Sequence, residues 1–218
     1  MAQPQYRDSI TTGYLGPTDY TPLVPIESLT FSAGDWLWLM AMDDADAKAI
    51  DTPAGWTAGI DVLHAQGCSS RWFYKVATGS ETNFEMAQMA APIIHLVSVN
   101  PNGGTISIVA SPTSSNAASA TSTTATTAGA ADALVLVGFV NDDNMSVATP
   151  PATMTVMEVD PSAGCALASY YEEIGTGDFT RSLVWSSSGG VHAHAVVLTS
   201  AAAGGLSIPI AMSIYAQQ

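Results

Sequence analysis

GDWLWLMAMDDAD, residues 34–46, is the stretch that decides the fold, because a related stretch, ADALVLVGFVNDD, returns at residues 131–143. Adding 97 to the residue number takes Asp35 to Asp132. Without a gap, the same shift relates Leu37 to Leu134, Leu39 to Leu136, Asp46 to Asp143, Thr52 to Thr149, Pro53 to Pro150, Val62 to Val159, Gly67 to Gly164, Cys68 to Cys165, Tyr74 to Tyr171 and His95 to His192. A constant offset held over so long a run indicates an internal duplication.

Both copies show the same order of features, which predicts a duplicated β unit. Each copy reads as an apolar strand, an acidic loop, Thr-Pro, a second strand, Gly-Cys and an aromatic strand. The period exceeds that of solenoids and propellers, whose repeats are about 20 to 50 residues long. The two units are either two small sandwiches or two halves of one sandwich that exchange strands, and we expect the single sandwich.

Runs of β-branched and aromatic residues, bounded by Gly, Pro, Asn and Asp, predict strands along most of the chain. The expected strands are 35–42, 56–64, 70–77, 93–100, 105–110, 132–140, 153–159, 165–174, 180–186, 191–199 and 207–215. Little helix is expected, because no stretch combines a 3.6-residue apolar period with helix caps. The expected fold class is all-β, an antiparallel β-sandwich that resembles a jelly roll.

Composition divides the chain into five segments. The expected divisions are an N-terminal Pro-rich arm at 1–30, a first β unit at 31–110, a Ser/Thr/Ala-rich linker at 111–130, a second β unit at 131–200 and a C-terminal strand or tail at 201–218. Prolines disfavour a strand in the arm, which we expect to dock on a neighbouring subunit. The linker has the composition of a flexible segment, but its threonines also suit an extended edge strand.

The charge balance excludes several classes of partner. The chain has 19 acidic and 5 basic residues, and the basic ones are scattered. Nucleic-acid binding requires clustered Lys and Arg, and an anionic membrane surface would repel this chain. Only 11% of the residues are charged and 47% are hydrophobic. We therefore expect partner subunits to cover much of the surface, most simply in a homo-oligomer.

The two ends of the sequence predict neither a signal peptide nor a membrane span. The start, MAQPQYR, lacks a basic segment followed by an apolar run. The apolar stretch 196–216 is interrupted by Gly204, Gly205 and Pro209, whereas a membrane span needs about 20 apolar residues in a helix. We expect synthesis in the cytoplasm and two C-terminal strands joined by a turn.

The first strand carries large apolar side chains on both of its faces. Successive side chains of a strand point to opposite faces, and the repeated Leu37 and Leu39 are expected to face the common core. Trp36, Trp38 and Met40 then point outward, where a monomer normally has polar residues. These three residues are the candidate interface, because aromatic residues and Met are enriched at interface cores. Cover by a second layer of the same chain and a ligand groove are the alternatives.

No catalytic arrangement is evident, and the chain is not expected to be an enzyme. His192 and His194 lie on one face of a strand and could bind a metal, but we interpret them and His95 as packed core histidines. The motifs H-E-x-x-H, G-x-S-x-G and the P-loop are absent. Glu172 or Glu173 could be imagined as a glycosidase pair with Glu158, but Glu172 and Glu173 are adjacent in a strand, so they point to opposite faces and cannot flank one glycosidic bond.

The other metal candidates lack a suitable spacing of ligands. The acidic stretch 43–46 and its counterpart 141–144 offer oxygen ligands for calcium, but neither has the spacing of an EF-hand, and we interpret both as solvated turns. Cys68 and Cys165 have no further ligands nearby and are expected to be buried small hydrophobes. No cofactor and no metal are expected.

Three motifs of the first copy resemble a β-rich module of bacteriophage virion proteins. They are Gly-Asp before an apolar strand at 34–35, TPAGWT at 52–57 and RWFYKVA at 71–77. In that module, TPAGWT and YYKVA-like stretches recur in proteins usually called tail-fibre or structural proteins. The resemblance covers about residues 34–100 and recurs in weaker form at 132–199. It implies a virion role and provides no catalytic residues.

The resemblance and the composition together favour a non-catalytic structural protein of a phage particle. A capsid decoration or cement protein, which stabilises the head by subunit contacts, is the leading hypothesis. A tail-fibre or baseplate component that contacts the host is the first alternative, although the chain has no heptads. A carbohydrate-binding module is the second alternative. The expected partners are other virion proteins, either the major capsid protein or tail proteins, and the expected location is the virion.

Overall fold

The regular secondary structure of the described residues is almost entirely β. The computed structural model describes residues 3–12, 21–44, 49–63, 67–161 and 164–202. Within these ranges it has sixteen strands and one 3-10 helix of three residues. The same residues include no helix with the length and hydrophobicity of a membrane span. The expected strand 207–215 lies outside the described residues.

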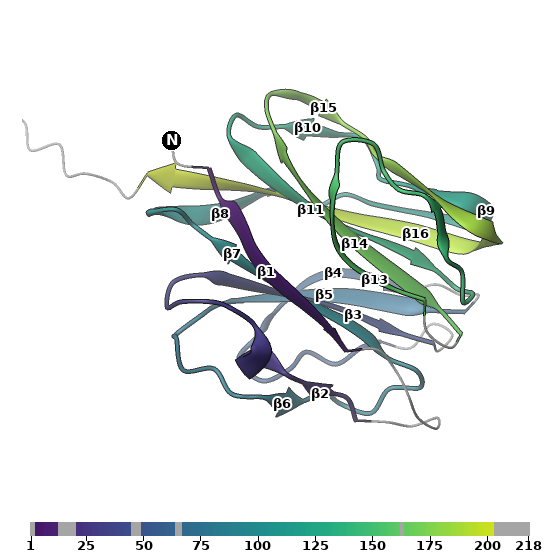
Figure 1. Cartoon of the computed structure of the whole chain (residues 1–218), viewed down its shortest axis with the longest axis horizontal. Coiled ribbons are helices and arrows are strands. Elements are labelled where there is room, and N and C mark those ends of the chain that lie inside the picture. Colours follow the sequence, from purple (N-terminus) through teal and green to yellow (C-terminus); the bar gives the residue numbers. More distant parts are fainter. Residues whose placement is uncertain (1–2, 13–20, 45–48, 64–66, 162–163, 203–218) are drawn as a thin grey trace, which may run out of the picture.

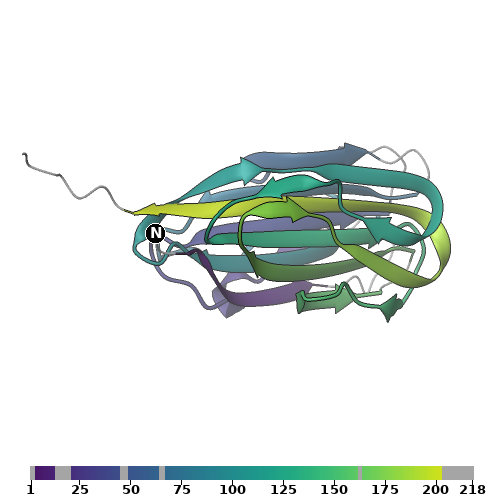
Figure 2. The same ribbon diagram turned by 90° about the horizontal axis from the view of Figure 1, so that it is seen from above.

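Two antiparallel sheets pack face to face, as Figure 1 and the view from above in Figure 2 show. The first sheet has the order β1 (Gln5–Thr12), β7 (Ile93–Asn100), β3 (Trp36–Asp43), β5 (Ser69–Val76) and β4 (Thr57–Leu63). The second has the order β12 (Val147–Thr149), β16 (Ser182–Ala202), β11 (Ala133–Asn141), β14 (Ala166–Ile174) and β13 (Thr155–Asp160), and β8 (Gly104–Ala110) and β9 (Thr113–Thr123) also pair with β16. The short elements are β2 (Leu23–Val24), β6 (Phe84–Glu85), β10 (Thr127–Gly129), β15 (Gly177–Phe179) and the helix η1 (Ile26–Ser28). The predicted all-β antiparallel sandwich is confirmed.

The two copies of the repeat form the two sheets of one sandwich. Four strands occur in the same order in both sheets: β7-β3-β5-β4 in the first and β16-β11-β14-β13 in the second. Strand β8 follows β7 in the chain but pairs with β16 in the opposite sheet. The first copy therefore contributes a strand to the sheet of the second copy, and the two copies do not form separate domains.

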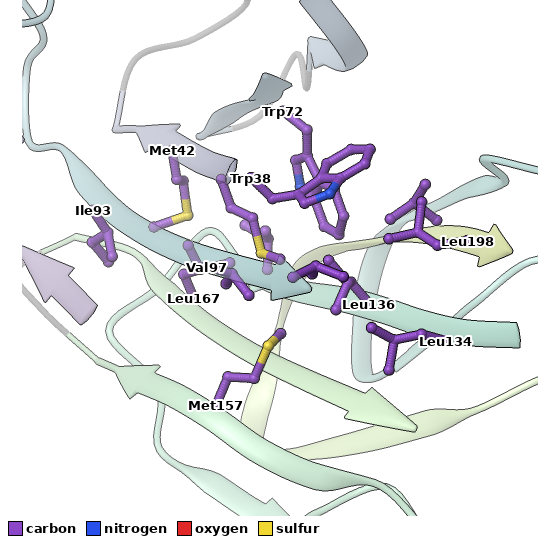
Figure 3. Close-up of a cluster of buried hydrophobic side chains, with 14 of the residues drawn as sticks. Trp38, Met42, Trp72, Ile93, Val97, Leu134, Leu136, Met157, Leu167 and Leu198 are labelled. Carbon is purple, nitrogen blue, oxygen red and sulfur yellow. The ribbon is translucent and has the colours of Figure 1, made fainter. Parts of the chain in front are cut away.

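The layer between the two sheets is the main hydrophobic core, shown in Figure 3. The first sheet contributes Trp38, Met40, Met42, Trp72, Val97 and Val99, and the second contributes Leu134, Leu136, Leu167, Val196 and Leu198. The rings of Trp38 and Trp72 meet edge to face with their centroids 6.3 Å apart. Full burial of a large apolar side chain contributes about 1.5–3 kcal/mol, so this layer is a principal source of stability.

Each sheet also has a covered outer face. Segments 24–29 and 84–89 pack over the first sheet, and their apolar side chains contact Leu37, Leu39 and Phe73. Corresponding contacts on the second sheet involve Phe179, Leu183 and Trp185, packed against residues of β11 and β14. Since both faces of β3 and β11 are buried, these strands are apolar at nearly every position, a pattern more usual in parallel sheets.

The central strands of the two copies are offset by 98 residues, one more than the gap-free alignment predicts. Trp38 pairs with Tyr74 across β3 and β5, and Leu136 pairs with Tyr171 across β11 and β14. Tyr74 and Tyr171 are 97 residues apart, so Trp38 corresponds to Leu136 and not to Val135. The first copy therefore has one more residue between β3 and β5 than the second copy has between β11 and β14, and the sequence alignment placed no gap there.

The turns before the strands follow the same offset of 98 residues. Gly55 has φ of 79° and Thr153 has φ of 68°, and each stands two residues before its strand, β4 or β13. Trp56 therefore corresponds to Met154, whereas the sequence alignment placed Thr153 there. Trp56 and Met154 both pack on the outer face of their own sheet. The apolar role of this position is conserved between the copies, even though the aromatic ring is not.

The N-terminal segment differs from the expected Pro-rich arm. Residues Gln5–Thr12 form β1, which pairs with β7 and completes the first sheet. The stretch lies between Pro4 and Pro17, so no proline interrupts its ladder of hydrogen bonds. It also joins the two sheets, because Ser9 donates a hydrogen bond to Glu158 Oε1 at 3.0 Å and the Tyr6 ring stacks on Tyr171 at 4.3 Å.

The expected linker at 111–130 is largely strand. Residues Thr113–Thr123 form β9 and pair with β16 over most of their length. Of the two possibilities left open by the composition, the structure therefore has the edge strand. The backbone of β9 provides the donors and acceptors that pair with β16. Its Ser and Thr side chains carry no charge that would have to be desolvated.

Replacing Gly138 by Val should destabilise the fold by about 1–3 kcal/mol, because overpacking a core displaces its side chains. A Cβ atom at Gly138 would lie 2.9 Å from the ring of Trp72. Urea unfolding followed by circular dichroism measures the change. Gly175→Ala is the matched control, since a Cβ atom there meets nothing within 4 Å. Equal stability of the two variants would contradict the packing of Trp72 on β11.

Candidate functional site: an open sheet edge beside an aromatic pocket

Three aromatic rings form a row at one end of the central core. The ring of Tyr74 lies between Trp36 and Trp38, with centroid distances of 5.3 Å and 5.1 Å. Strands β3 and β5 position this row, because their register pairs Trp38 with Tyr74. Trp38 is buried, whereas Trp36 and Tyr74 are half-buried. The row thus extends from the core to the surface.

The orientation of β3 corrects the sequence prediction for Trp36, Trp38 and Met40. Trp38 and Met40 are each 1% exposed and face the second sheet, while Leu37 and Leu39 face outward under segments 24–29 and 84–89. A shift of one residue in a strand moves every side chain to the other face, and the 97-residue alignment carried such a shift. Trp38 and Met40 therefore have no surface for a second subunit, and cover within the same chain accounts for both.

A small pocket opens beside the aromatic row, between the two sheets. It has a volume of about 160 Å³ and is lined by Trp38, Gly59, Tyr74, Ile108, Ser111 and Val196. Pockets for small-molecule ligands measure about 300–1,000 Å³. This pocket is smaller than that range, so it suits a single apolar side chain better than a sugar chain or a cofactor.

Strands β8 and β9 form an edge of the second sheet next to this pocket. Among the described strands they pair only with β16, so they form an edge of the second sheet. Within β9, the side chains of Ser114, Asn116 and Ser119 hydrogen-bond to several backbone groups of the same strand. Ile108 and Val109 on β8 are 37% and 51% exposed. No Asp, Glu, Lys or Arg occurs from Met86 to Ala131, although charged residues are a usual protection of sheet edges. We call residues 104–123 the neutral edge.

Each copy has one ion pair at the end of its aromatic strand. The charges are exchanged between the copies, because Lys75 of the first copy corresponds to Glu172 of the second. In the first copy Lys75 Nζ lies 3.3 Å from Glu81 Oε1 and 5.8 Å from the Trp56 ring centroid. In the second copy Arg181 binds both carboxylate oxygens of Glu172 at 2.7 Å. Each ion pair lies on the outer face of its own sheet, and each fixes the loop that follows the aromatic strand.

The pKa of Glu81 reflects this loop structure. Burial by itself would raise the pKa, but hydrogen bonds from the backbone N–H and the hydroxyl of Thr78, together with the N–H of Gly79, lower it to about 2. The carboxylate thus acts as an anchor for the loop and stays ionised at neutral pH.

The described histidines are buried between the sheets in hydrogen bonds with serines. Ser70 Oγ lies 2.6 Å from His192 Nε2 and 2.7 Å from His194 Nε2. Between β7 of the first sheet and β14 of the second, His95 Nδ1 lies 2.8 Å from Ser169 Oγ. A hydroxyl has one hydrogen, so Ser70 donates to one ring and accepts from the other. All five side chains are at most 2% exposed.

Burial also determines the charge of these rings. Desolvation lowers the pKa of His95 and of His194 to about 3 in each case, so both are neutral at physiological pH. The indole of Trp72 stacks on His194 with an interplanar angle of 8°. The geometry matches the interpretation of packed core histidines. His64 lies outside the described residues.

The first residue of each acidic stretch, Asp43 or Asn141, binds backbone groups of the same chain, while residues 45 and 46 lie outside the described residues. Asp43 is fully buried, and its Oδ1 accepts hydrogen bonds from the N–H groups of Ala90 and Ala91. Asn141 takes the equivalent place in β11, and its Oδ1 accepts the N–H of Asp143. Within the described residues no group of three or more His, Cys, Asp or Glu side chains could hold a metal.

The carboxylates considered for glycosidic chemistry are bound to different partners. Glu158 lies at the contact between β1 and β13, where burial and then the charges of Asp8 and Asp160 raise its pKa, against the lowering effect of the Ser9 hydrogen bond. Glu172 is held by Arg181. The structure thus gives each of the two carboxylates a structural partner.

Comparisons with the models of known protein families, with curated proteins and with solved structures give no match to this chain.

Stability should fall as the pH decreases from 7 to 5, by about 2 kcal/mol for each of His95 and His194. Each folded pKa, about 3, lies below the usual unfolded value of 6.5. Between these two values the unfolded chain binds protons that the folded chain does not, so acid favours unfolding. Urea unfolding at several pH values measures the slope.

The variant His194→Phe retains a ring against Trp72 but cannot titrate. It should remove about half of the pH dependence between pH 7 and 5, whatever its stability at pH 7. The Glu81 carboxylate does not interfere, because it titrates below this window. An unchanged slope would contradict a neutral, buried His194.

Proposed function

We propose that this chain is a non-catalytic structural protein of a bacteriophage particle, and that it acts as a capsid decoration protein through its neutral edge. The observation that carries this proposal is the uncharged sheet edge formed by β8 and β9, which both pair with β16 and lie beside a pocket of side-chain size. The resemblance of residues 34–100 to a phage virion module supports the location. The partners in this proposal are the major capsid protein and further copies of the chain.

A sheet edge is suited to permanent contacts with other proteins. A partner strand can add to an edge strand such as β8 by backbone hydrogen bonds, and alternate side chains then enter neighbouring pockets. The side chains of Ile108 and Val109 supply apolar area at this place. Desolvation of ionised groups is a large cost at interfaces. Because the edge has no charged side chains, a partner can pack on it without that cost.

The net charge of the chain also supports a contact through the neutral edge. The formal charge is −14, which opposes non-specific association of copies in solution. A neutral strip on an acidic protein is a place where another subunit can approach without charge repulsion. This arrangement favours specific assembly over aggregation, which exposed sheet edges otherwise promote.

The aromatic residues give less support to the alternative of a carbohydrate-binding module. Sugar platforms require exposed rings, but every aromatic side chain in the described ranges is buried or half-buried. Trp56 is 9% exposed and Trp72 is 1% exposed. Trp72 in particular belongs to the core, so the loss of its ring would affect stability before it affected any ligand.

Labelled antibody against this chain should decorate the head of the phage particles that contain it, as seen by electron microscopy. Label distributed over the head supports the capsid role. Label confined to the tail would replace it by the tail-fibre or baseplate alternative, and no label on any particle would contradict a virion role altogether.

Replacing Val109 by Lys should weaken binding of the purified chain to its particles at least about tenfold, because it places an unpaired charge in a contact. Val76→Lys is the matched control, since both valines are 51% exposed and Val76 lies outside the neutral edge. Sedimentation with the particles measures the binding. Equal loss in both variants would show that the edge has no special role.

A further inference from the structure

The two cysteines of the chain meet at the centre of the sandwich. Cys68 precedes β5 and Cys165 precedes β14, so they occupy equivalent places in the two copies. Both are free thiols, both are 1% exposed, and both belong to the hydrophobic layer between the sheets. The thiol of Cys165 lies within hydrogen-bonding reach of Cys68.

The repeat itself explains why the two thiols meet. The glycine before each cysteine packs against the acidic loop of the other copy, since a Cβ atom on Gly67 would lie 2.6 Å from Cβ of Asp142 and one on Gly164 would collide with Asp44. These reciprocal contacts hold the two Gly-Cys turns against opposite loops. The cysteines that follow are thereby placed against each other, one from each sheet.

The surroundings shield both thiols in the folded chain, because each cysteine is only 1% exposed. The hydrogen bond with Cys68, then burial, then the electrostatic influence of Cys68 and Asp44 raise the pKa of Cys165 far above its usual range. Only the thiolate attacks a disulfide, so Cys165 does not react in the closed sandwich.

We propose that Cys68 and Cys165 are a latent disulfide, which a small-molecule disulfide such as oxidised glutathione closes during folding or transient opening of the sandwich. The thiolate of one cysteine attacks the glutathione disulfide, forms a mixed disulfide and releases one reduced glutathione. The second thiolate then attacks the protein sulfur of the mixed disulfide and releases the other glutathione. In total the two protein thiols lose two protons and two electrons, and one glutathione disulfide becomes two thiols.

The bond would join the two sheets directly. It closes a long loop that runs from Cys68 through the end of the first copy and the beginning of the second to Cys165, and long loops give the largest restriction of the unfolded chain. The oxidised protein should therefore melt at a higher temperature than the reduced protein, by on the order of 10 °C. This inference does not depend on the phage assignment, since it concerns the folded chain alone.

The test is to refold the full chain from urea with oxidised glutathione and to compare it with chain refolded under a reducing agent. Intact mass after alkylation should show no free thiol, no glutathione adduct and the loss of two hydrogen atoms. Calorimetry should show the higher melting temperature, and added reductant should reverse it. Two alkylated thiols, a stable glutathione adduct or a lower melting temperature in the oxidised form would each overturn the proposal.

The double variant Cys68→Ala with Cys165→Ala is the control, and its melting temperature should not respond to oxidised glutathione. A response of the same size in this variant would assign the shift to another cause and overturn the proposal. If the variant does not fold, the comparison of oxidised and reduced wild-type chain still decides the question.

Discussion

Burial of the central strands on both faces is the constraint on which the rest of the structure depends. Strand β3 packs Trp38 and Met40 into the layer between the sheets and Leu37 and Leu39 into a second layer outside it. Strand β11 has the same double role in the second sheet. Such a sheet is stable only if other segments cover its outer face. The short elements β2, η1 and β6, and the residues around β15, supply this cover, and they account for a chain that is rich in apolar residues and poor in charges.

The duplication gives the two sheets a common plan, and their differences lie at the edges. Strand β1 extends the first sheet and bonds to β13 of the second, which closes one side of the sandwich. On the other side β8 and β9 extend the second sheet along β16, and β4 is the last strand of the first. The contact proposed for assembly lies on this second side. The charged groups follow the duplication in a different way, since the ion pairs of Lys75 and Glu172 have opposite polarity in equivalent loops.

The polar groups inside the sandwich indicate a rigid core more than a reactive one. The hydroxyls of Ser70 and Ser169 satisfy imidazole nitrogens that would otherwise be buried without partners, and a buried polar group without a partner costs about 1–3 kcal/mol. Such a network tolerates one arrangement of the two sheets. The two serines are not equivalent residues of the two copies, whereas Cys68 and Cys165 are, so the internal symmetry creates the dithiol but not the histidine contacts.

The sequence by itself determined the fold class, the duplication and most strand positions, because alternation of side chains, β-branched runs and turn residues are local properties. It could not determine the orientation of β3, since residues from Trp36 to Met42 are all apolar and no polar side chain marks the outer face. It left β9 undecided between linker and strand, because Ser and Thr suit both and only the free edge of β16 selects the strand. The contact of Cys68 with Cys165, and the pocket between Tyr74 and Ile108, join residues far apart in the chain. Their closeness depends on how two sheets pack, and only the tertiary structure decides that.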